Sequence, residues 1–357
     1  MTAPNTLTDG AGDAANLAPV SESRTVGARR LWQRARGLLP TFIALALLLG
    51  MLIYAEAAYG RVFHAGTISD LLIGAAPMLI LAVGMTIVIV SAGIDLSVGA
   101  VVAFSSVSGV MIMNTGVNGW LGVLAMVAFG ALFGLVAGVM VQVFNVQPFI
   151  ATLAMMFLAR GLASMLTTDV VRAPEGSPFE WLASKWKLYD GPKVNDFIVT
   201  PGLVIAVVVV ILAVWFMHRT RMGRTVYGIG GSDGSAQLMG LPVARTRVWI
   251  YVLSGACAGL AAVVYTASVQ GAARNVTGLG WELDAIAAVV IGGTLLTGGA
   301  GYVLGSVIGV LVLQTLRLII TKDGTIDPQY LTIITGAVLL AFVLLQRVLA
   351  SRTGRQQ

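Results

Sequence analysis

The chain has 357 residues, of which 57% are hydrophobic and only 11% are charged, and its mean hydropathy is +0.89. Ordinary soluble domains carry roughly 25% charged residues, so this composition excludes a water-soluble globular protein. The net charge of +6 does not indicate a nucleic-acid partner, because the basic residues cluster beside apolar segments. The length allows about ten membrane helices of ~20 residues each, with their loops.

The N-terminal segment, residues 1–37, is predicted to be a disordered, basic cytoplasmic tail. Residues 1–23 are rich in Ala, Thr, Asn, Ser and Asp without periodicity, which is typical of segments that bury no core. A group of arginines follows: Arg24, Arg29, Arg30, Arg34 and Arg36. The apolar run after them has no cleavage site of the signal-peptide kind, so we expect it to be a retained membrane helix.

Hydropathy marks ten segments along the chain, including this run, as transmembrane helices, so the expected fold class is an all-α polytopic membrane protein. They cover residues 38–58, 69–91, 97–114, 120–143, 149–167, 200–217, 247–270, 282–299, 302–321 and 329–349. Residues 38–349 would then be one transmembrane domain, and residues 350–357 a short tail.

The arginines predict how this domain lies in the membrane. They cluster in the N-terminal tail, in the loop 218–246 and at the C-terminus. Short positive loops stay on the cytoplasmic side, so both termini and the loop 218–246 are expected there. The loop 168–199 balances its four basic residues with five acidic ones and is expected on the outer side.

Two halves of five helices each must be inverted relative to each other if one arose by duplication of the other, because five is an odd number. Three features recur in order and favour such a repeat: an aspartate at a helix end, a glycine ridge with four-residue spacing, and a proline turn. They are Asp95 and Asp284; Gly130, Gly134, Gly138 and Gly301, Gly305, Gly309; and Gln147-Pro148 and Asp327-Pro328. Plain helix packing also explains each glycine ridge taken alone.

Asp95 is a charge within an otherwise apolar stretch, AGIDLSVGAVVAF at residues 92–104. A charge in the membrane interior costs several kcal/mol, so such a residue is hidden from lipid and often functional. The related stretch WELDAIAAVVIGG, residues 281–293, carries Glu282 and Asp284. Two interpretations stay open for these carboxylates: they cap helix starts, or they contact a transported substrate.

The sequence indicates no catalytic, metal or cofactor site. It has no GxxxxGK[ST] motif for ATP phosphates, and its histidines, His64 and His218, are predicted on opposite sides of the membrane. The single Cys257 lies in an apolar run and suits packing. A membrane-embedded enzyme would need a catalytic cluster. An ion-coupled secondary transporter that uses Asp95 or Asp284 stays open as an alternative.

The loop 218–246 contains the stretch GRTVYGIGGSDGSAQLMGLPVARTR at residues 223–247. Its glycines, Gly228, Gly230, Gly231 and Gly234, are expected to break any long helix, whereas residues 235–240 can form a short one. A short helix flanked by arginines suits docking into a groove of another protein. An ordinary solvated loop is the alternative.

Three separated stretches resemble the inner-membrane permeases of bacterial sugar ABC importers, in the branch for ribose, xylose and galactofuranose. They are GMTIVIVSAGIDLSVGA, YGIGGSDGSAQLMGL and WELDAIAAVVIGGTLLTGGAGYVLG. The stretches HRTRMGRTVYGIGG and SAQLMG and the ending DGT…LLQR are most similar to a permease of galactofuranose importers. The resemblance covers residues 40–349; the tail 1–37 matches no family motif.

This resemblance implies a ten-helix, inverted-repeat permease subunit that moves a monosaccharide such as galactofuranose by alternating access and is not itself an enzyme. It implies four partners: a cytosolic ATP-binding subunit that hydrolyses ATP, a second permease that is homologous or identical, a periplasmic or lipid-anchored sugar-binding protein, and the lipid of the bacterial inner membrane. No cofactor is expected in this chain. The family's coupling helix, which contacts the ATPase, is matched in this chain by Ser235, Ala236, Leu238, Met239 and Gly240.

A neutral, hydroxyl-rich sugar needs hydrogen-bond partners rather than strong charges along its path. The residues predicted to line this path, or to cap its helices, are Asp95, Ser97, Asn275, Glu282 and Asp284. The outer loop 168–199, with Trp181, Trp186 and Tyr189, is expected to be periplasmic and to help dock the binding protein.

Overall fold

The computed structural model describes residues 22–189, 196–324 and 330–354. The chain divides into two compact units, Met1–Leu38 and Leu39–Gln357. Within the first unit, the described residues form the beginning of helix α1. The second unit contains all the other elements and is described by itself below.

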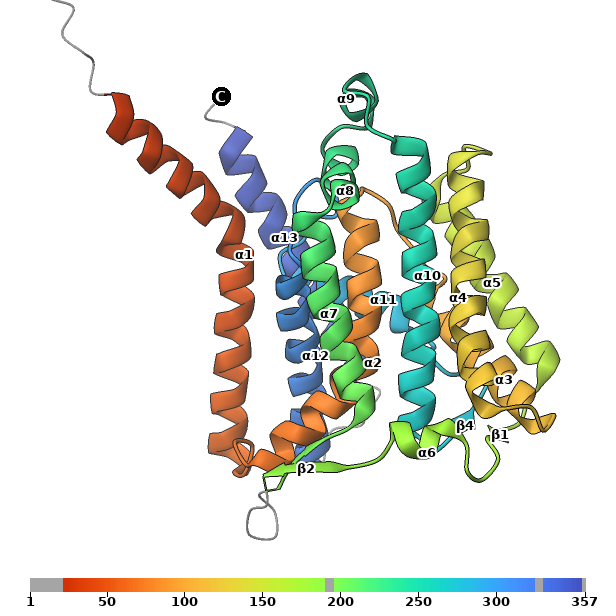
Figure 1. Cartoon of the computed structure of the whole chain (residues 1–357). Coiled ribbons are helices and arrows are strands. Elements are labelled where there is room, and N and C mark those ends of the chain that lie inside the picture. Colours follow the sequence, from red (N-terminus) through yellow and green to blue (C-terminus); the bar gives the residue numbers. More distant parts are fainter. Residues whose placement is uncertain (1–21, 190–195, 325–329, 355–357) are drawn as a thin grey trace, which may run out of the picture. The chain divides into compact units, whose positions relative to one another are not determined.

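The described residues contain thirteen helices and four short strands (Figure 1). The helices are α1 (Glu22–Tyr59), α2 (Ala65–Val90), α3 (Val98–Asn114), α4 (Gly119–Gln142), α5 (Pro148–Leu166), α6 (Pro178–Leu182), α7 (Pro201–Arg219), α8 (Arg221–Gly231), α9 (Asp233–Leu238), α10 (Val243–Ser268), α11 (Trp281–Ile291), α12 (Val303–Asp323) and α13 (Tyr330–Gly354). The strands are β1 (Val171–Arg172), β2 (Trp186–Tyr189), β3 (Phe197–Val199) and β4 (Ala272–Ala273).

Seven of the described helices are long and apolar enough to cross a membrane: Leu39–Tyr59 of α1, α2, α4, α5, α7, α10 and α12. α3 and Thr332–Leu344 of α13 are apolar but shorter, and α11 has only 11 residues. The chain is therefore a helical polytopic membrane protein, with seven candidate spans in its described residues where hydropathy predicts ten.

Most predicted segments match an observed helix to within a few residues, but the segment 282–299 is too long. α11 ends at Ile291, and a turn-rich connection leads from there to α12. Gly293, Gly298 and Gly299 in this connection have φ values of 97°, 82° and 75°, which lie outside the helical region. Hydropathy records the apolar character of these residues but not the left-handed conformation that glycine permits.

Two segments predicted to lack a long helix differ in the structure. Of the tail 1–37, residues 1–21 lie outside the described residues, whereas residues 22–37 belong to α1, since Arg, Leu and Ala favour helices. In the loop 218–246, α8 runs through Gly228 and Gly230 to Gly231. A side chain at Gly230 would overlap the carbonyl oxygen of Val90, so this glycine provides space for close packing.

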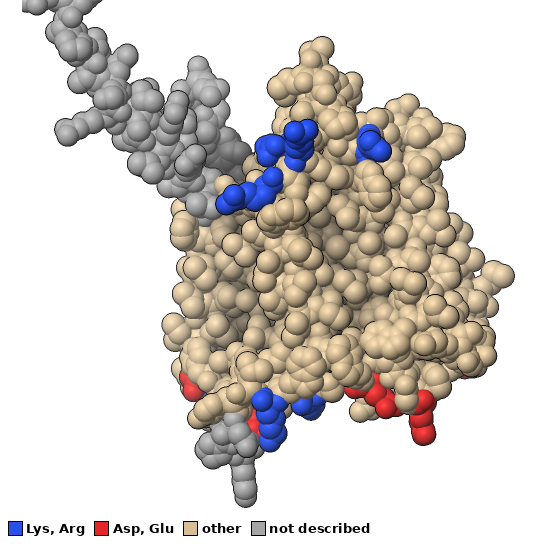
Figure 2. Space-filling view, in the orientation of Figure 1, with Lys and Arg blue, Asp and Glu red and all other residues tan. Residues whose placement is uncertain are grey.

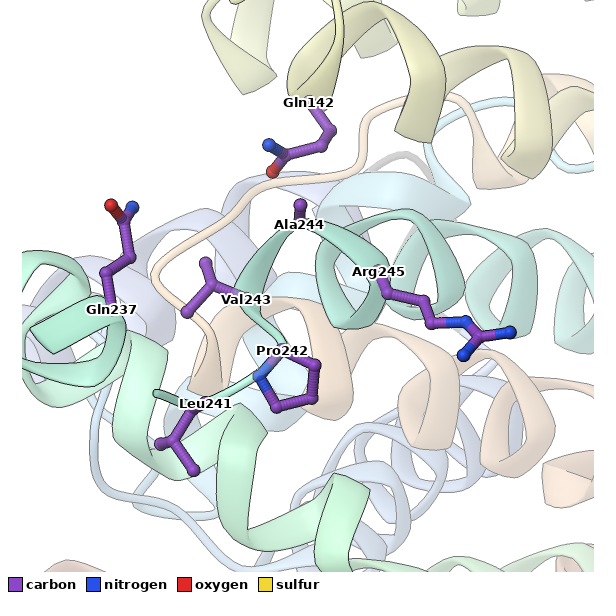
Figure 3. Close-up of a pocket in the computed structure, with 7 residues that line it drawn as sticks. All are labelled: Gln142, Gln237, Leu241, Pro242, Val243, Ala244 and Arg245. Atoms are coloured by element: carbon purple, nitrogen blue, oxygen red, sulfur yellow. The ribbon is translucent and has the colours of Figure 1, made fainter. Parts of the chain in front are cut away.

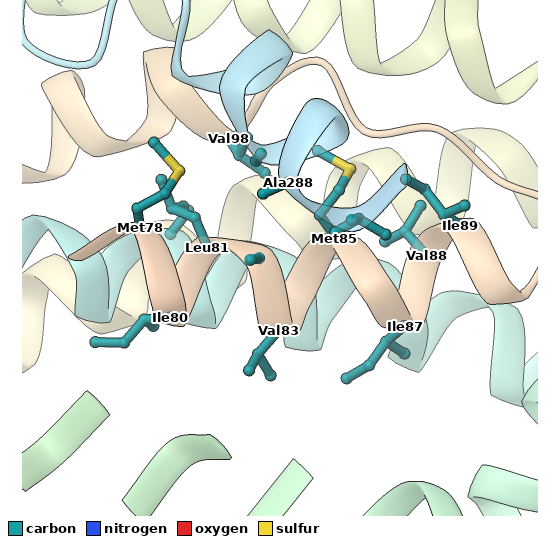
Figure 4. Close-up of a cluster of buried hydrophobic side chains, with 14 of the residues drawn as sticks. Met78, Ile80, Leu81, Val83, Met85, Ile87, Val88, Ile89, Val98 and Ala288 are labelled. Carbon is teal, nitrogen blue, oxygen red and sulfur yellow. The ribbon is translucent and has the colours of Figure 1, made fainter. Parts of the chain in front are cut away.

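α2 is surrounded by protein, with 89% of its most apolar window buried. Its sequence is apolar around the whole circumference, as expected for a helix that contacts protein on every side. Figure 4 shows Met78, Ile80 and Val83 extending from different sides of α2, with Ala288 of α11 nearby. Together with other buried side chains they form the hydrophobic core of the second unit.

The two halves of the chain exchange their second long helices. α2 packs against α7, α10, α11 and α12, which all belong to the C-terminal half. α10 packs against α3 and α4 of the N-terminal half, and against α2. α2 and α10 therefore lie side by side at the centre, each among helices of the opposite half (Figure 1).

The first glycine ridge lets α4 approach α10 closely. A side chain at Gly134 would overlap the carbonyl oxygen of Tyr251, and one at Gly130 would overlap that of Gly255. The second ridge has a different partner, because Gly305 and Gly309 of α12 face α11 and the turn after it. Of the proline turns, Gln147-Pro148 opens α5, whereas Asp327-Pro328 lies outside the described residues.

The end of the second unit opposite α9 has regular structure within the predicted outer loop. β1 pairs with β4 and β2 pairs with β3, both antiparallel. The hydroxyl of Ser69, near the start of α2, is hydrogen-bonded to the backbone of Ile198 and holds β3 against α2. Trp120, Trp181 and Trp186 pack edge to face in series, with ring centroids 6.0 and 6.2 Å apart.

Candidate functional site: two buried junctions and an exposed helix

Residues 91–97, here called the crossover segment, lead from α2 to α3 and contain Asp95, which is 1% exposed. One carboxylate oxygen of Asp95 accepts hydrogen bonds from the backbone NH (3.0 Å) and the hydroxyl (2.6 Å) of Ser97. The other accepts one from the hydroxyl of Ser254 on α10, at 2.7 Å. The N-cap position of α3 is Ser97, so Asp95 supports the turn before α3 from two residues ahead of the cap, and it also joins this turn to α10.

α2 and α10 end in the same uncommon way. After each helix, a residue other than glycine has a positive φ: 61° at Ala92 and 53° at Gln270. A glycine follows in both places, and both ends have the two hydrogen bonds of a Schellman motif. These bonds join Ala92 N to Ile89 O, Gly93 N to Val88 O, Gln270 N to Ala267 O and Gly271 N to Thr266 O. L-residues seldom adopt this conformation, so the two helix ends share an uncommon backbone geometry.

The beginnings of α3 and α11 meet at a second junction. Gly99 and Gly278 pack so closely that a side chain at Gly99 would overlap the carbonyl oxygen of Gly278. The carboxylate of Glu282 lies at the same place, and its Oε2 is buried with no hydrogen-bond partner among the described residues. A helix N-terminus carries partial positive charge, so the start of α3 stabilises this carboxylate.

Arg160 of α5 holds the loop that precedes α11. Its Nη1 donates hydrogen bonds to the carbonyl oxygens of Asn275 and Thr277, both at 2.8 Å. Its charge also attracts Glu282. The side-chain amide of Asn275 donates to the hydroxyl of Ser164, again on α5, at 3.1 Å. α5 therefore fixes both the backbone and the side chain of Asn275.

Asp284 does not cap α11. The N-cap position is Gly280, whose φ is 81°, and Asp284 is the fourth residue of the helix. Its carboxylate forms an ion pair with Arg317 of α12, and the two side chains are 23% and 32% exposed. The capping prediction is therefore wrong for Asp284, because the helix begins four residues earlier than it would if Asp284 were its N-cap.

The structure brings the predicted path or cap residues together only in part. Asp95 and Ser97 share the crossover segment, Asn275 and Glu282 share the junction at α5, and Asp284 contacts α12 instead. Asp95 precedes α3 whereas Asp284 lies inside α11, so the two aspartates are not equivalent positions of a repeat.

We expect removal of one partner of the Asp284–Arg317 pair to lower the stability of the folded protein more than removal of both partners. Arg317→Gln leaves a half-buried carboxylate without its counter-charge, which should destabilise the protein by about 2 kcal/mol, below the range for fully buried pairs. The double variant Arg317→Gln/Asp284→Asn should recover most of this loss. Thermal unfolding of the detergent-solubilised variants measures both effects; equal losses in the single and double variants would contradict the prediction.

The end of the second unit at α8 and α9 carries the predicted coupling residues. The hydroxyl of Ser232 accepts a hydrogen bond from the backbone NH of Ser235, at 3.3 Å, and starts α9. Leu238 is 91% exposed and Met239 is 68% exposed. Ser235 and Gly240 are exposed as well, whereas Ala236 is fully buried. Four residues of the predicted set are thus on the surface, and Ala236 instead packs α9 onto the protein.

α9 is attached to two membrane helices by hydrogen bonds. Arg247 near the start of α10 donates to Asp233 of α9 at 2.6 Å and to Gln142, the last residue of α4, at 3.1 Å. Asp233 also accepts from Gln237, at 3.2 Å. This network holds α9 in a defined position, which an ordinary solvated loop would lack.

A pocket of about 510 Å³ lies beside α9. Figure 3 shows the chain turning from α9 into α10 along one side of it, with Gln142 of α4 across from that turn. Its lining residues are Gln142, Gln237, Leu241, Pro242, Val243, Ala244 and Arg245. Polar and apolar groups therefore surround a hollow next to the exposed Leu238.

α8 packs against the end of α2 and the connection before α12. The NH of Gly299 donates to the carbonyl oxygen of Val90 at 2.9 Å, and the hydroxyl of Tyr227 donates to that of Gly301 at 2.8 Å. Burial raises the pKa of Tyr227 to about 12, so its hydroxyl stays protonated and continues to donate. α9 follows α8 directly and is thereby connected to α2 as well as to α4 and α10.

Charge is distributed unevenly between the two ends of the second unit. Exposed arginines lie around α8 and α9, at Arg219, Arg221, Arg224 and Arg245. Figure 2 shows basic side chains without acidic ones at this end, and both basic and acidic side chains at the opposite end of this face. Among the described residues, no group of His, Cys, Asp and Glu side chains is placed to hold a metal ion.

Several contacts at the candidate site come from residues outside the predicted set: Arg160, Asp233, Arg247 and Ser254. A lone arginine within an apolar helix was a usable signal for Arg160, because a charge there needs partners. Ser254, in contrast, is one small residue among several in α10, and nothing in its sequence surroundings points to Asp95.

These features define a polytopic membrane protein in which a short exposed helix is mounted on the membrane helices. The chain belongs to the family described as branched-chain amino acid transport system / permease component, whose model matches residues 67–343.

Three relatives agree with this assignment. The fructose import permease protein FruG of Bifidobacterium longum is 48% identical over 89% of this chain and 94% of its own length. The ribose import permease protein RbsC of Escherichia coli K12 is 39% identical over 74% and 80%, respectively. The galactofuranose transporter permease protein YtfT of the same strain is 35% identical over 80% and 81%. The resemblance predicted from the motifs is confirmed. No solved structure matches the chain.

Proposed function

We propose that this chain is the transmembrane permease subunit of an ATP-driven importer for a monosaccharide. The observation that carries the proposal is the mounted helix α9, with Leu238 and Met239 exposed, on a chain 48% identical to a sugar import permease. ATP hydrolysis belongs to a separate subunit in this scheme, since the permease itself has no phosphate-binding motif. The relatives are named for fructose, ribose and galactofuranose, so these sugars are the substrates to test first.

The ten predicted segments form two inverted five-helix repeats in this proposal. The matching ends of α2 and α10 support it, because each long helix leads through a Schellman turn and an irregular segment into a shorter helix. The two shorter helices, α3 and α11, meet at their N-termini, an arrangement typical of discontinuous helices in transporters.

A second permease, homologous or identical, covers the face formed by α5 and the loop before α11. Phe157 and Leu279 on this face are 66% and 73% exposed, beside the half-buried Arg160 and Glu282. Charged groups next to lipid are costly, so a protein partner is the favoured neighbour of this face. Sugar hydroxyls would pass between the two permeases, where Glu282 and the Asn275 loop offer hydrogen-bonding groups.

The mechanism follows from these contacts. ATP-driven closure of the ATPase moves α9, and the network of Asp233, Arg247 and Gln142 transmits this movement to α10 and α4. The membrane helices then alternate between outward and inward access. A periplasmic or lipid-anchored binding protein delivers the sugar, and the aromatic residues Trp181, Trp186 and Tyr189 at the other end are its proposed docking residues.

The ion-coupled alternative is weakened by the surroundings of both aspartates. Asp95 accepts three hydrogen bonds on its two oxygens, and Asp284 is paired with Arg317. The decisive experiment measures uptake of fructose, ribose and galactofuranose by vesicles that contain the permeases, the ATPase and the binding protein. We expect uptake of one of these sugars to require ATP and to survive a protonophore at constant ATP. Uptake that collapses with the proton gradient and needs no ATPase would refute the proposal.

Both termini, α8 and α9 are proposed to be cytoplasmic, since four exposed arginines lie around α8 and α9, whereas the exposed arginines at the opposite end lie among acidic residues such as Glu175 and Glu180. We expect a cysteine at Ser235 to react with a membrane-impermeant thiol reagent only after cells are opened, and one at Lys185 to react in intact cells. Both sites are exposed, and a Cys257→Ala background removes the native thiol. Labelling of position 235 in intact cells would reverse the proposed orientation.

A further inference from the structure

One face of α10 carries three polar residues that contact elements far apart in the chain. They are Arg247, Tyr251 and Ser254, at the spacing that places residues on one side of a helix. Tyr251 is 2% exposed and Ser254 is fully buried, although both carry hydroxyl groups. Their partners therefore lie inside the protein rather than in solvent.

The three residues reach from the exposed helix to the crossover segment. Arg247 is bonded to Asp233 of α9. The Tyr251 hydroxyl packs against the backbone at Gly93, since a Cβ added to Gly93 would lie 2.7 Å from it. Ser254 donates to Asp95 at 2.7 Å. α9 and Asp95 are thus both attached to the same face of the same helix.

Asp95 in turn controls the start of α3 through Ser97. The irregular crossover segment can change its dihedral angles more easily than a helix, so it is a natural place for a hinge. A hydrogen bond to a carboxylate is stronger than one between neutral groups, and burial strengthens it further. The Ser254–Asp95 bond therefore links α10 to the start of α3, while Thr266 of α10 is hydrogen-bonded to Ser106 further along α3.

Resting on the function proposed above, we propose that the Ser254–Asp95 hydrogen bond is the connection through which movement of α9 reaches α3. Ser254 and Asp95 are positioning residues in this scheme: they touch neither ATP nor sugar. Their loss should leave ATP hydrolysis in place but reduce the sugar moved for each ATP hydrolysed. A purely structural role would lower protein stability and yield without changing that ratio.

The test measures ATP hydrolysis and sugar uptake on the same proteoliposomes of the complete importer. We expect Ser254→Ala to lower uptake per ATP roughly tenfold, as the loss of a hydrogen bond to a charged group predicts. Asp95→Asn should retain most of the ratio, because its amide donates to Ser254 while its oxygen still accepts from Ser97. Asp95→Ala should lower uptake per ATP as much as Ser254→Ala does.

Ser306→Ala is the matched control. Ser306 is 1% exposed and shares a 2.7 Å hydrogen bond with Thr86 between α12 and α2, away from the α10 face. Its removal deletes a buried bond of the same length and should leave uptake per ATP unchanged. An unchanged ratio in Ser254→Ala, or an equal fall in Ser306→Ala, would overturn the proposal.

A double variant tests whether the contacts act in series. Arg247→Ala should also lower the ratio, and Arg247→Ala/Ser254→Ala should lower it no further than the more severe single variant. If the two substitutions lowered uptake per ATP independently and additively, the contacts of Arg247 and Ser254 would not act in series. If the wild-type importer itself shows no ATP-dependent sugar uptake, the proposed function fails and not the connection within the fold.

Discussion

Replacement of Leu238 by aspartate is expected to abolish ATP-driven uptake while the permease stays folded in the membrane. Leu238 is 91% exposed at the end of α9, so its substitution removes no internal packing. In the proposed complex Leu238 is buried against the ATPase, and a charge at this position opposes that burial. A single residue at the centre of an interface can contribute 2 kcal/mol or more to the free energy of binding, so its loss lowers the affinity about 30-fold. Co-purification of the ATPase with the permease and uptake in vesicles are the measurements.

Two comparisons separate docking from folding. Leu188→Asp introduces the same charge at a residue that is 70% exposed at the opposite end, and it should leave ATPase retention unchanged. Ala236→Asp places the charge at a fully buried position and should also lower thermal stability, because α9 loses its packing on the protein. Normal ATPase retention in Leu238→Asp would show that the partner binds elsewhere.

The variant Gly134→Leu is expected to prevent stable folding. A side chain at this position meets the carbonyl group of Tyr251 on α10, and backbone atoms of a buried helix cannot move aside. Overpacking commonly costs 1–3 kcal/mol, and the rigid contact places this case at about 3 kcal/mol. The fraction of monodisperse protein after heating in detergent reports the loss.

Gly50→Leu in α1 is the control for this variant. Nothing lies within 4 Å of a Cβ added to Gly50, which faces outward. Leucine is also favourable next to lipid and in a helix, so we expect unchanged or slightly raised stability. Equal losses in both variants would mean that any added bulk disrupts insertion, and that the α4–α10 contact is not specific.

The sequence predicts best those features that depend on a run of like residues. The apolar segments, the arginine clusters and the short helix near Ser235 belong to this group, because each is a local property of the chain. The end of α11 escapes prediction, since Gly292 and Gly293 are nearly neutral in hydropathy and do not interrupt the apolar run around them. What stops the helix there is packing against Gly305 and Thr41, which belong to distant segments.

The side-chain partners of the site are predicted least well. An aspartate two residues before a serine indicates the start of a helix. In the structure Asp95 does contact Ser97, directly before α3. Its bond to Ser254 joins residues 159 positions apart and depends on how α10 crosses α2. Likewise, the local sequence places Ala236 and Leu238 in the same short helix. How α9 packs on the protein determines that Ala236 is buried and Leu238 is exposed.

The exchange of α2 and α10 has a consequence for the synthesis of this protein. When α2 leaves the ribosome, the helices that will enclose it, α7, α10, α11 and α12, have not yet been translated. Its strongly apolar surface keeps it stable in lipid during that interval. Native burial of α2 must therefore wait until α12 is inserted, after most of the chain has been translated. Fragments cut between α5 and α7 should consequently reach the membrane separately, yet acquire their final packing only when both halves are produced in the same cell.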